Sequence, residues 1–175
     1  QLPEIVDADP EWRATAIYSR AELQTLISDP RIPRDERVVH ALLGLAGLRL
    51  GEMCGLRWRM LSVDMLPLGR IVVARSYMKR GTKTKAVRWM PIHPTLSRVL
   101  REWFERGWES VIGRPPEPDD LVVPTPPPSR GKGRRTPAGQ MRTKSYVEKH
   151  FWKQLDALGL AHRRVHDLRR TFISL

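Results

Sequence analysis

The sequence has few cysteines, no long apolar run and a shortage of acidic residues. Cys54 is the one cysteine among 175 residues, which excludes an internal disulfide and a zinc site built from several cysteines. No stretch approaches the roughly 20 apolar residues that a transmembrane helix requires. A lone thiol on the apolar side of a helix is expected to be buried. Absent disulfides favour a reducing, cytoplasmic compartment.

The shortage of acidic residues leaves a large positive charge. Lys and Arg number 31 against 19 Asp and Glu, so the formal net charge is +12 at pH 7. Such a surface attracts polyanions and binds them in a salt-dependent way. Nucleic acid is therefore the expected partner. An anionic membrane is the alternative, but no amphipathic helix rich in Lys and Arg stands out.

The periodicity predicts helices in the first third of the chain. Residues 1–17 show no clear period and are expected to form a linker or arm. Ser19 and Glu22 form a capping box that opens a helix, which the prolines at 30 and 33 end. A second apolar stripe predicts a helix over residues 35–46, and Gly47 is expected to end it in the left-handed conformation.

The period then changes to alternation, which predicts three antiparallel strands with a basic second turn. They are expected over residues 62–65, 70–77 and 86–90. A helix should follow from Pro94 toward Val111, and a last full helix should span 143–158. The fold class is therefore α+β, mainly α, in one domain over 18–175.

Residues 113–142 are dense in proline and contain an Arg/Lys run. This composition predicts a long mobile loop, because it buries too little apolar surface to order itself. A loop that follows DNA and a solvated insertion are equally compatible with it.

Two short motifs carry the chemistry. Residues 47–52 read Gly-Leu-Arg-Leu-Gly-Glu, which places Arg49 at the junction of two helices with Glu52 able to orient it. A surface ion pair between the two is the alternative. Residues 166–172 read His-Asp-Leu-Arg-Arg-Thr-Phe, and the i, i+3 spacing puts His166 and Arg169 on one helix face. Two arginines and a histidine in a basic chain suggest phosphate chemistry.

In their residues, their order and the distance between them in the chain, these two motifs resemble the signature boxes of the tyrosine recombinases, the phage integrase family. The resemblance covers the chain from about Tyr18 onward. It implies a helical catalytic domain with a small sheet, of the type that breaks and rejoins double-stranded DNA through a 3′-phosphotyrosyl intermediate. It implies neither a metal nor a cofactor.

The resemblance also implies catalytic roles. Arg49 and Arg169 match the arginines that stabilise charge on the phosphate, and His166 matches a general base or hydrogen-bonding partner. The family places a general-acid lysine in the second turn of the sheet. Lys83 fits best, with Lys85 and then Lys79 as alternatives. Further DNA contacts are expected from Lys79, Arg80, Lys85, Lys132, Arg134, Arg135 and Lys144.

The nucleophilic tyrosine is where the sequence departs from the family pattern. The family places it after the His-x-x-Arg box, whereas Tyr18, Tyr77 and Tyr146 all precede the box. The chain is therefore expected to be C-terminally incomplete, and to bind DNA without cutting it. The parent protein is expected to act as a tetramer on DNA, while a monomer stays open for the fragment.

Three alternatives remain at the level of sequence. They are a non-catalytic recombinase relic that binds DNA, an enzyme resembling a type IB topoisomerase, and a basic RNA-binding protein.

Overall fold

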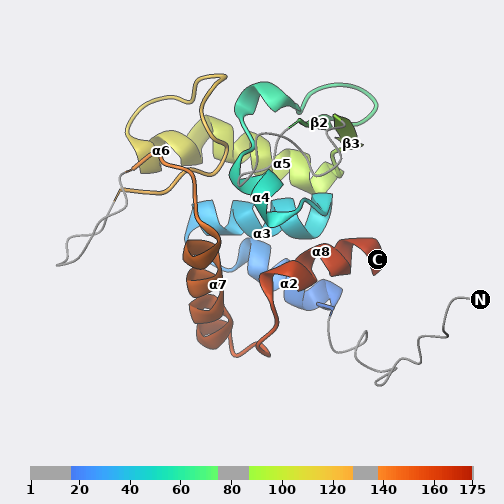
Figure 1. Ribbon diagram of the computed structural model, residues 1–175, viewed down its shortest axis with the longest axis vertical. Helices are drawn as coiled ribbons and strands as arrows, with labels where there is room; N and C mark the ends of the chain where they lie inside the picture. The colour runs from blue at the N-terminus through green and yellow to red at the C-terminus, as the bar shows by residue number, and fades with distance from the viewer. Residues whose placement is uncertain (1–16, 75–86, 128–137, 175) are drawn as a thin grey trace, which may run out of the picture.

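The computed structural model describes residues 17–74, 87–127 and 138–174 (Figure 1). Its elements along the chain are α2 (Arg20–Ser28), α3 (Arg34–Ala46), α4 (Leu50–Cys54), η1 (Trp58–Met60), β1 (Leu61–Ser62), β2 (Arg70–Val73), β3 (Arg88–Pro91), α5 (Pro94–Glu102), η2 (Trp103–Gly107), α6 (Trp108–Ile112), α7 (Lys144–Leu158) and α8 (Val165–Ser174). The predicted class, mainly helical with a small three-stranded antiparallel sheet, is confirmed. Among the described residues, no helix is long and apolar enough to cross a bilayer.

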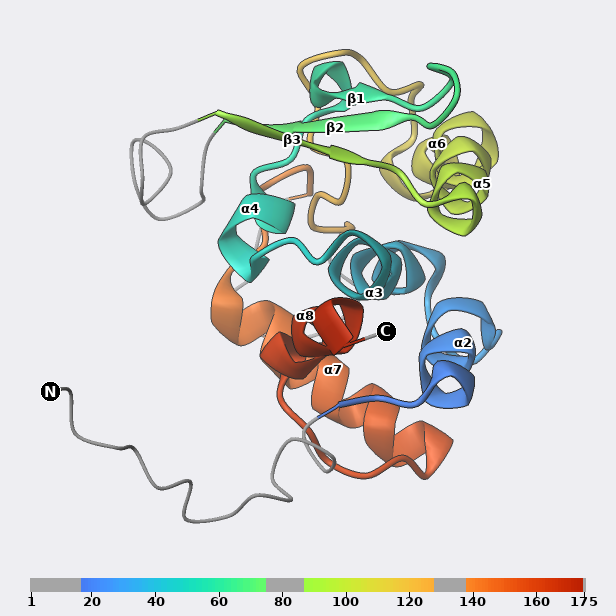
Figure 2. The same ribbon diagram turned by 90° about the vertical axis from the view of Figure 1, so that its right-hand side faces the viewer.

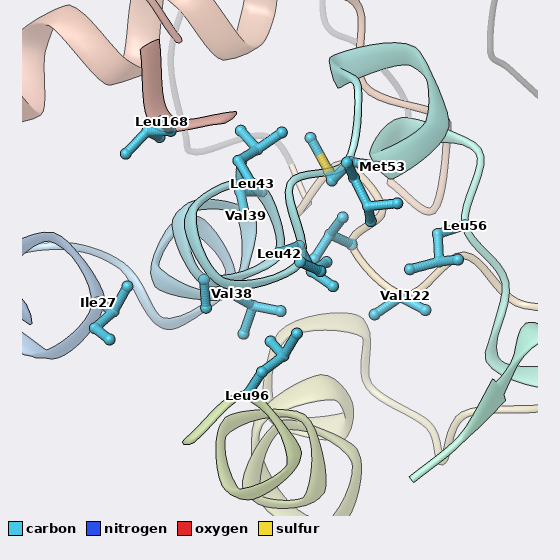
Figure 3. Close-up of a cluster of buried hydrophobic side chains, with 14 of the residues drawn as sticks. Ile27, Val38, Val39, Leu42, Leu43, Met53, Leu56, Leu96, Val122 and Leu168 are labelled. Atoms are coloured by element: carbon cyan, nitrogen blue, oxygen red, sulfur yellow. The ribbon is translucent and has the colours of Figure 1, made fainter. Parts of the chain in front are cut away.

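Helix α3 is the centre of the fold. The sheet, α5 and α6 lie on one side of it, and α2, α7 and α8 lie on the other (Figure 2). Leu42 and Leu43 of α3 are buried among side chains that include Leu96 of α5 and Leu168 of α8 (Figure 3). Because α3 contacts both halves, the residues at its C-terminal end have fixed positions relative to α8.

The helix ends follow the local sequence signals. Ser19 and Glu22 form both hydrogen bonds of the predicted capping box. Gly47 ends α3 with φ of 57°, and Gly159 ends α7 with φ of 67°. Both values lie in the left-handed region that glycine adopts without a steric penalty. The predicted capping box and the predicted left-handed end at Gly47 are confirmed.

The sheet has the order β1-β2-β3 and both pairs are antiparallel. Ile71 and Val73 of β2 are buried, so the strand shows the expected alternation. Within the described residues the first two strands are shorter than predicted, and the third is shifted by one residue toward the C-terminus. In the third, β3 begins at Arg88, which pairs with Val73.

The prediction that residues 113–142 are too polar to order is wrong for the described part of that stretch. Val122 and Val123 are fully buried. The indole nitrogens of Trp103 and Trp108 donate to the carbonyls of Val122 and Leu121, at 2.7 and 3.1 Å. An apolar triplet inside a proline-rich stretch therefore packs as core, although the average composition of the stretch argues against it.

A buried ion cluster connects the end of this stretch to the start of α3. The Arg142 side chain has no exposed surface, and its guanidinium lies 2.5 Å from Asp35 Oδ2 and 2.5 Å from Glu36 Oε1. It also donates to the carbonyls of Val123 and Pro124. Burying a charge is costly unless it is paired and hydrogen-bonded, and here both conditions are met. The cluster fixes the N-terminal end of α3.

Candidate functional site: an arginine cluster at the α3–α4 junction

Arg49 has an extended backbone and directly precedes α4. The Glu52 carboxylate binds both its backbone and its side chain. The Arg49 backbone N–H donates to Glu52 Oε2 at 2.8 Å, and Arg49 Nη1 donates to Oε1 at 3.1 Å. The Glu52 side chain is 2% exposed, whereas that of Arg49 is 51% exposed. The carboxylate is thus a buried support for a side chain that is half exposed to solvent.

The second motif reaches the same junction from α8. Arg169 Nη1 donates to the carbonyl of Gly47, 122 positions earlier in the chain. The Phe172 ring packs against Gly47 so closely that an added Cβ would lie 2.2 Å from Phe172 Cδ1. The two motifs therefore meet at Gly47, and glycine is required there both by its φ and by this contact.

Positive charge accumulates around Glu52. Burial lowers the pKa of Arg169, and the neighbouring guanidiniums of Arg49 and Arg88 lower it further, while Glu52 acts in the opposite direction. Arg88 Nη2 lies 2.6 Å from Glu52 Oε2. Two guanidiniums thus pair with one carboxylate and that of Arg169 lies nearby, so an anion bound beside them would relieve their mutual repulsion.

His166 lies on α8 beside a cavity of about 360 Å³ that also has Arg164, Arg169 and Arg170 in its lining. Burial lowers the pKa of His166, and the charge of Arg170 lowers it further, against the opposing effect of Asp167. A lowered pKa favours the neutral imidazole near neutral pH. Neutral imidazole can accept a proton or a hydrogen bond.

The other predicted DNA contacts are mostly outside the described residues. Lys79, Arg80, Lys83 and Lys85 fall in 75–86, and Lys132, Arg134 and Arg135 fall in 128–137. Lys144 is described. It begins α7, lines the same cavity as His166, and its Nζ lies 3.6 Å from Glu148 Oε1.

The two described tyrosines differ in burial. Tyr18 is fully buried, and burial raises its pKa. Tyr146 stacks on His150, with its ring centroid 4.1 Å away, and burial raises its pKa as well. Tyr77 lies outside the described residues. Within the described ranges, no three His, Cys, Asp or Glu side chains gather as a metal ion would require.

Sequence reasoning missed Arg88 as part of this cluster. It was expected only as a strand residue, although it is a basic side chain that closely follows the basic turn. Its carboxylate partner is 36 positions earlier, and no local pattern indicates that pairing. The role of the Gly47 carbonyl as an acceptor for Arg169 was also missed, because backbone groups carry no sequence signal.

Residues 19–174 match the sequence profile of the phage integrase family. The tyrosine recombinase XerC of Xanthomonas axonopodis pv. citri (strain 306) is 31% identical over 103 residues, which is 59% of this chain and 28% of the relative. The chain thus spans well under two thirds of that relative.

Solved structures share the fold at low sequence identity. The XerH recombinase bound to difH, in a pre-cleavage complex, has a TM-score of 0.59 at 16% identity, covering 90% of this chain and 41% of that one. A lambda integrase (75–356) dimer bound to a COC′ core site has a TM-score of 0.58 at 16% identity, covering 91% and 51%. The Tn1549 transposon integrase with circular-intermediate DNA has a TM-score of 0.56 at 17% identity, covering 98% and 55%.

Proposed function

This chain belongs to the phage integrase family, and from that premise we propose that it is the catalytic domain of a site-specific DNA recombinase. The proposed domain spans residues 18–175, with 1–17 as the linker before it. The observation that carries the proposal is the contact between Arg169 and the Gly47 carbonyl, which brings both motif arginines to one partly exposed cluster. The proposed partner is double-stranded DNA in the cytoplasm, with the parent protein working as a tetramer.

The proposed reaction transfers a DNA phosphodiester to a tyrosine. The tyrosine oxygen attacks the scissile phosphorus, the bond to the 5′ oxygen breaks, and a 3′-phosphotyrosyl link forms. Negative charge develops on the non-bridging oxygens, and Arg49 and Arg169 stabilise it where it develops. The reverse attack by a 5′ hydroxyl rejoins the strand, so the bond energy is retained in the protein–DNA link.

Two proton transfers accompany this step. We assign His166 to the nucleophile side, as the group that accepts a proton or a hydrogen bond there, in keeping with its lowered pKa. We assign Lys83, with Lys85 and Lys79 as alternatives, to the leaving group, where a lysine donates a proton to the 5′ oxygen. These lysines lie outside the described residues, so their assignment rests on the resemblance alone.

The nucleophile is proposed to lie downstream of Arg169, in residues beyond those of this sequence. The full burial of Tyr18 supports this placement, because its hydroxyl cannot approach a phosphate at the arginine cluster, and Tyr146 precedes the His-x-x-Arg motif. The chain as given is then expected to bind DNA without forming a covalent link.

The test is covalent trapping on nicked DNA taken from the target element. The chain as given is compared with a protein that continues downstream through the expected tyrosine. We expect a covalent protein–DNA band from the longer protein alone. Arg49→Ala should reduce its formation about 10²- to 10³-fold, as removal of one transition-state donor does.

A matched control is Arg101→Ala. Arg101 is 49% exposed and pairs with one carboxylate, Asp64, so it matches Arg49 in exposure and pairing. It should leave trapping unchanged. If neither protein gives a band although both bind DNA, the reading as a recombinase fails and the non-catalytic relic replaces it.

A further inference from the structure

Arg88 contacts the support of Arg49 from a different part of the fold. It is the first residue of β3, and its Nη2 donates to Glu52 Oε2 at 2.6 Å. The same oxygen accepts the backbone N–H of Arg49. Both donors together occupy Oε2, which leaves only Oε1 for the Arg49 side chain.

The way in which the two Glu52 oxygens are shared between Arg88 and Arg49 determines how the Arg49 side chain is bound. A guanidinium beside a free carboxylate tends to form two parallel hydrogen bonds with it. Among the residues that the structure describes, the Arg49 guanidinium forms one hydrogen bond, from Nη1 to Glu52 Oε1. Its remaining donors are therefore available to a phosphate. Without Arg88, Oε2 would have room for a second guanidinium N–H, and Arg49 would turn toward Glu52.

The burial of Glu52 makes this competition strong. Its side chain is 2% exposed, while those of Arg49 and Arg88 are 51% and 35% exposed. A buried carboxylate requires charged or hydrogen-bonded partners. If one partner is removed, the other is drawn more tightly to the carboxylate.

We propose that Arg88 is a positioning residue for Arg49. It occupies Glu52 Oε2, so that the Arg49 guanidinium stays singly bonded and open to the scissile phosphate. The inference rests on the proposed function, because it assigns Arg88 a task in the same site. Arg88 also lies five positions after Lys83, so the contact connects the strand that follows the proposed general acid to the proposed phosphate-binding arginine.

The first experiment separates rate from affinity in the protein that continues through the expected tyrosine. Arg88→Met keeps the aliphatic stem and removes the charge. We expect its single-turnover cleavage rate on nicked DNA to fall about 10- to 100-fold at saturating protein, while its Kd for DNA changes by less than about 3-fold.

Arg88→Lys is the conservative variant. It keeps one charged donor for Oε2 and should recover the rate to within about 5-fold of the unmodified protein. Arg70→Met is the matched control, since it removes an exposed arginine from the neighbouring strand. It should leave the cleavage rate unchanged. Equal losses of rate and affinity in Arg88→Met would make Arg88 a phosphate contact and overturn the inference, and so would no loss beyond that of Arg70→Met.

The second experiment needs no catalysis and uses the chain as given. In a crystal structure of Arg88→Met, the Arg49 guanidinium should form hydrogen bonds to both oxygens of Glu52. An unchanged Arg49 would overturn the inference. If this rearrangement is seen but the longer unmodified protein forms no covalent link, the proposed function fails and the positioning contact stands. Should Arg88→Met fail to fold, Arg88→Ala, which also removes the donor to Oε2, provides the same two measurements with the same expected results.

Discussion

The molecule contains two clusters of arginine and carboxylate that differ in their charge balance. Around Arg142, one buried guanidinium meets two buried carboxylates, Asp35 and Glu36, and two backbone carbonyls. Around Glu52, one buried carboxylate meets two partly exposed guanidiniums, with that of Arg169 nearby. The first cluster is closed to solvent and the second is open.

The difference separates a structural use of arginine from a use suited to binding. In the buried cluster all guanidinium nitrogens have acceptors within the protein, so no ligand can be added. In the open cluster positive charge exceeds negative charge and donors remain accessible. Excess charge held in place by a buried carboxylate is what an incoming phosphate requires.

Breaking the buried cluster should give the largest loss of stability. Arg142→Met leaves Asp35 and Glu36 buried without their main partner, which typically costs about 3–5 kcal/mol. Urea unfolding of the chain measures this loss. Arg101→Met removes an exposed ion pair and should cost at most about 1 kcal/mol. A loss below about 1 kcal/mol in Arg142→Met would contradict the structural role.

Acid should break the same cluster in the unmodified chain. Burial alone would raise the pKa of Glu36, but the hydrogen bond from His150 and the charge of Arg142 bring it down to about 2. Glu36 thus binds its proton less readily when folded than when unfolded. Its contribution, on the order of 3 kcal/mol, is complete above about pH 4.5 and is lost as the pH falls toward 2.

Unfolding free energies measured between pH 2 and 7 check this prediction. Glu36→Gln should be less stable than the unmodified chain at pH 7, and the two curves should approach each other near pH 2. Parallel curves would show that Glu36 does not carry the acid sensitivity.

A smaller loss in the free energy of unfolding is expected from a substitution at Gly47, where the two motifs meet. Gly47→Ala places a Cβ at φ of 57° and against the Phe172 ring, which together should cost about 2–3 kcal/mol. Gly159→Ala is the control, because its φ of 67° is similar but no atom lies within 4 Å of the added Cβ. It should cost about 1 kcal/mol. Equal losses in the two variants would mean that the Phe172 contact carries no strain.

The smallest stability effect is expected in the open cluster. Arg49→Ala leaves Glu52 paired with Arg88 and removes a repulsion on Arg169, so unfolding should change by less than about 1 kcal/mol. DNA binding should instead weaken, and the salt dependence of log K should flatten by about one phosphate contact. A large stability loss with unchanged DNA binding would contradict the assignment of the open cluster to binding rather than to stability.

Sequence reasoning succeeded where the signal is local. The capping box at Ser19, the left-handed end at Gly47 and the burial of Cys54 all depend on neighbouring residues, and the structure confirms them. The two motifs were predicted to cooperate through the family resemblance, and the structure brings them together at Gly47.

Sequence reasoning failed where the two partners of an ion pair are far apart in the chain. It also failed where the average composition of a stretch conceals a short apolar segment. Asp35 and Glu36 lie more than a hundred positions from Arg142, and no periodicity connects them. The apolar triplet that ends at Val123 is hidden by the prolines around it. The catalytic and DNA-binding assignments within 75–86 and 128–137 stay predictions.

The backbone pairing at Thr125 has a consequence for how this domain diversifies. The Thr125 N–H donates to the Gln140 carbonyl at 2.8 Å, and the Gly139 N–H donates to the Thr125 carbonyl at 2.9 Å. Both ends of the intervening stretch are thereby fastened to each other and, through Arg142, to α3. A change in the number of residues between Thr125 and Gly139 should therefore leave these contacts to α3 in place. The pairing thus separates the length of this segment, which an engineer can vary, from the packing of α3.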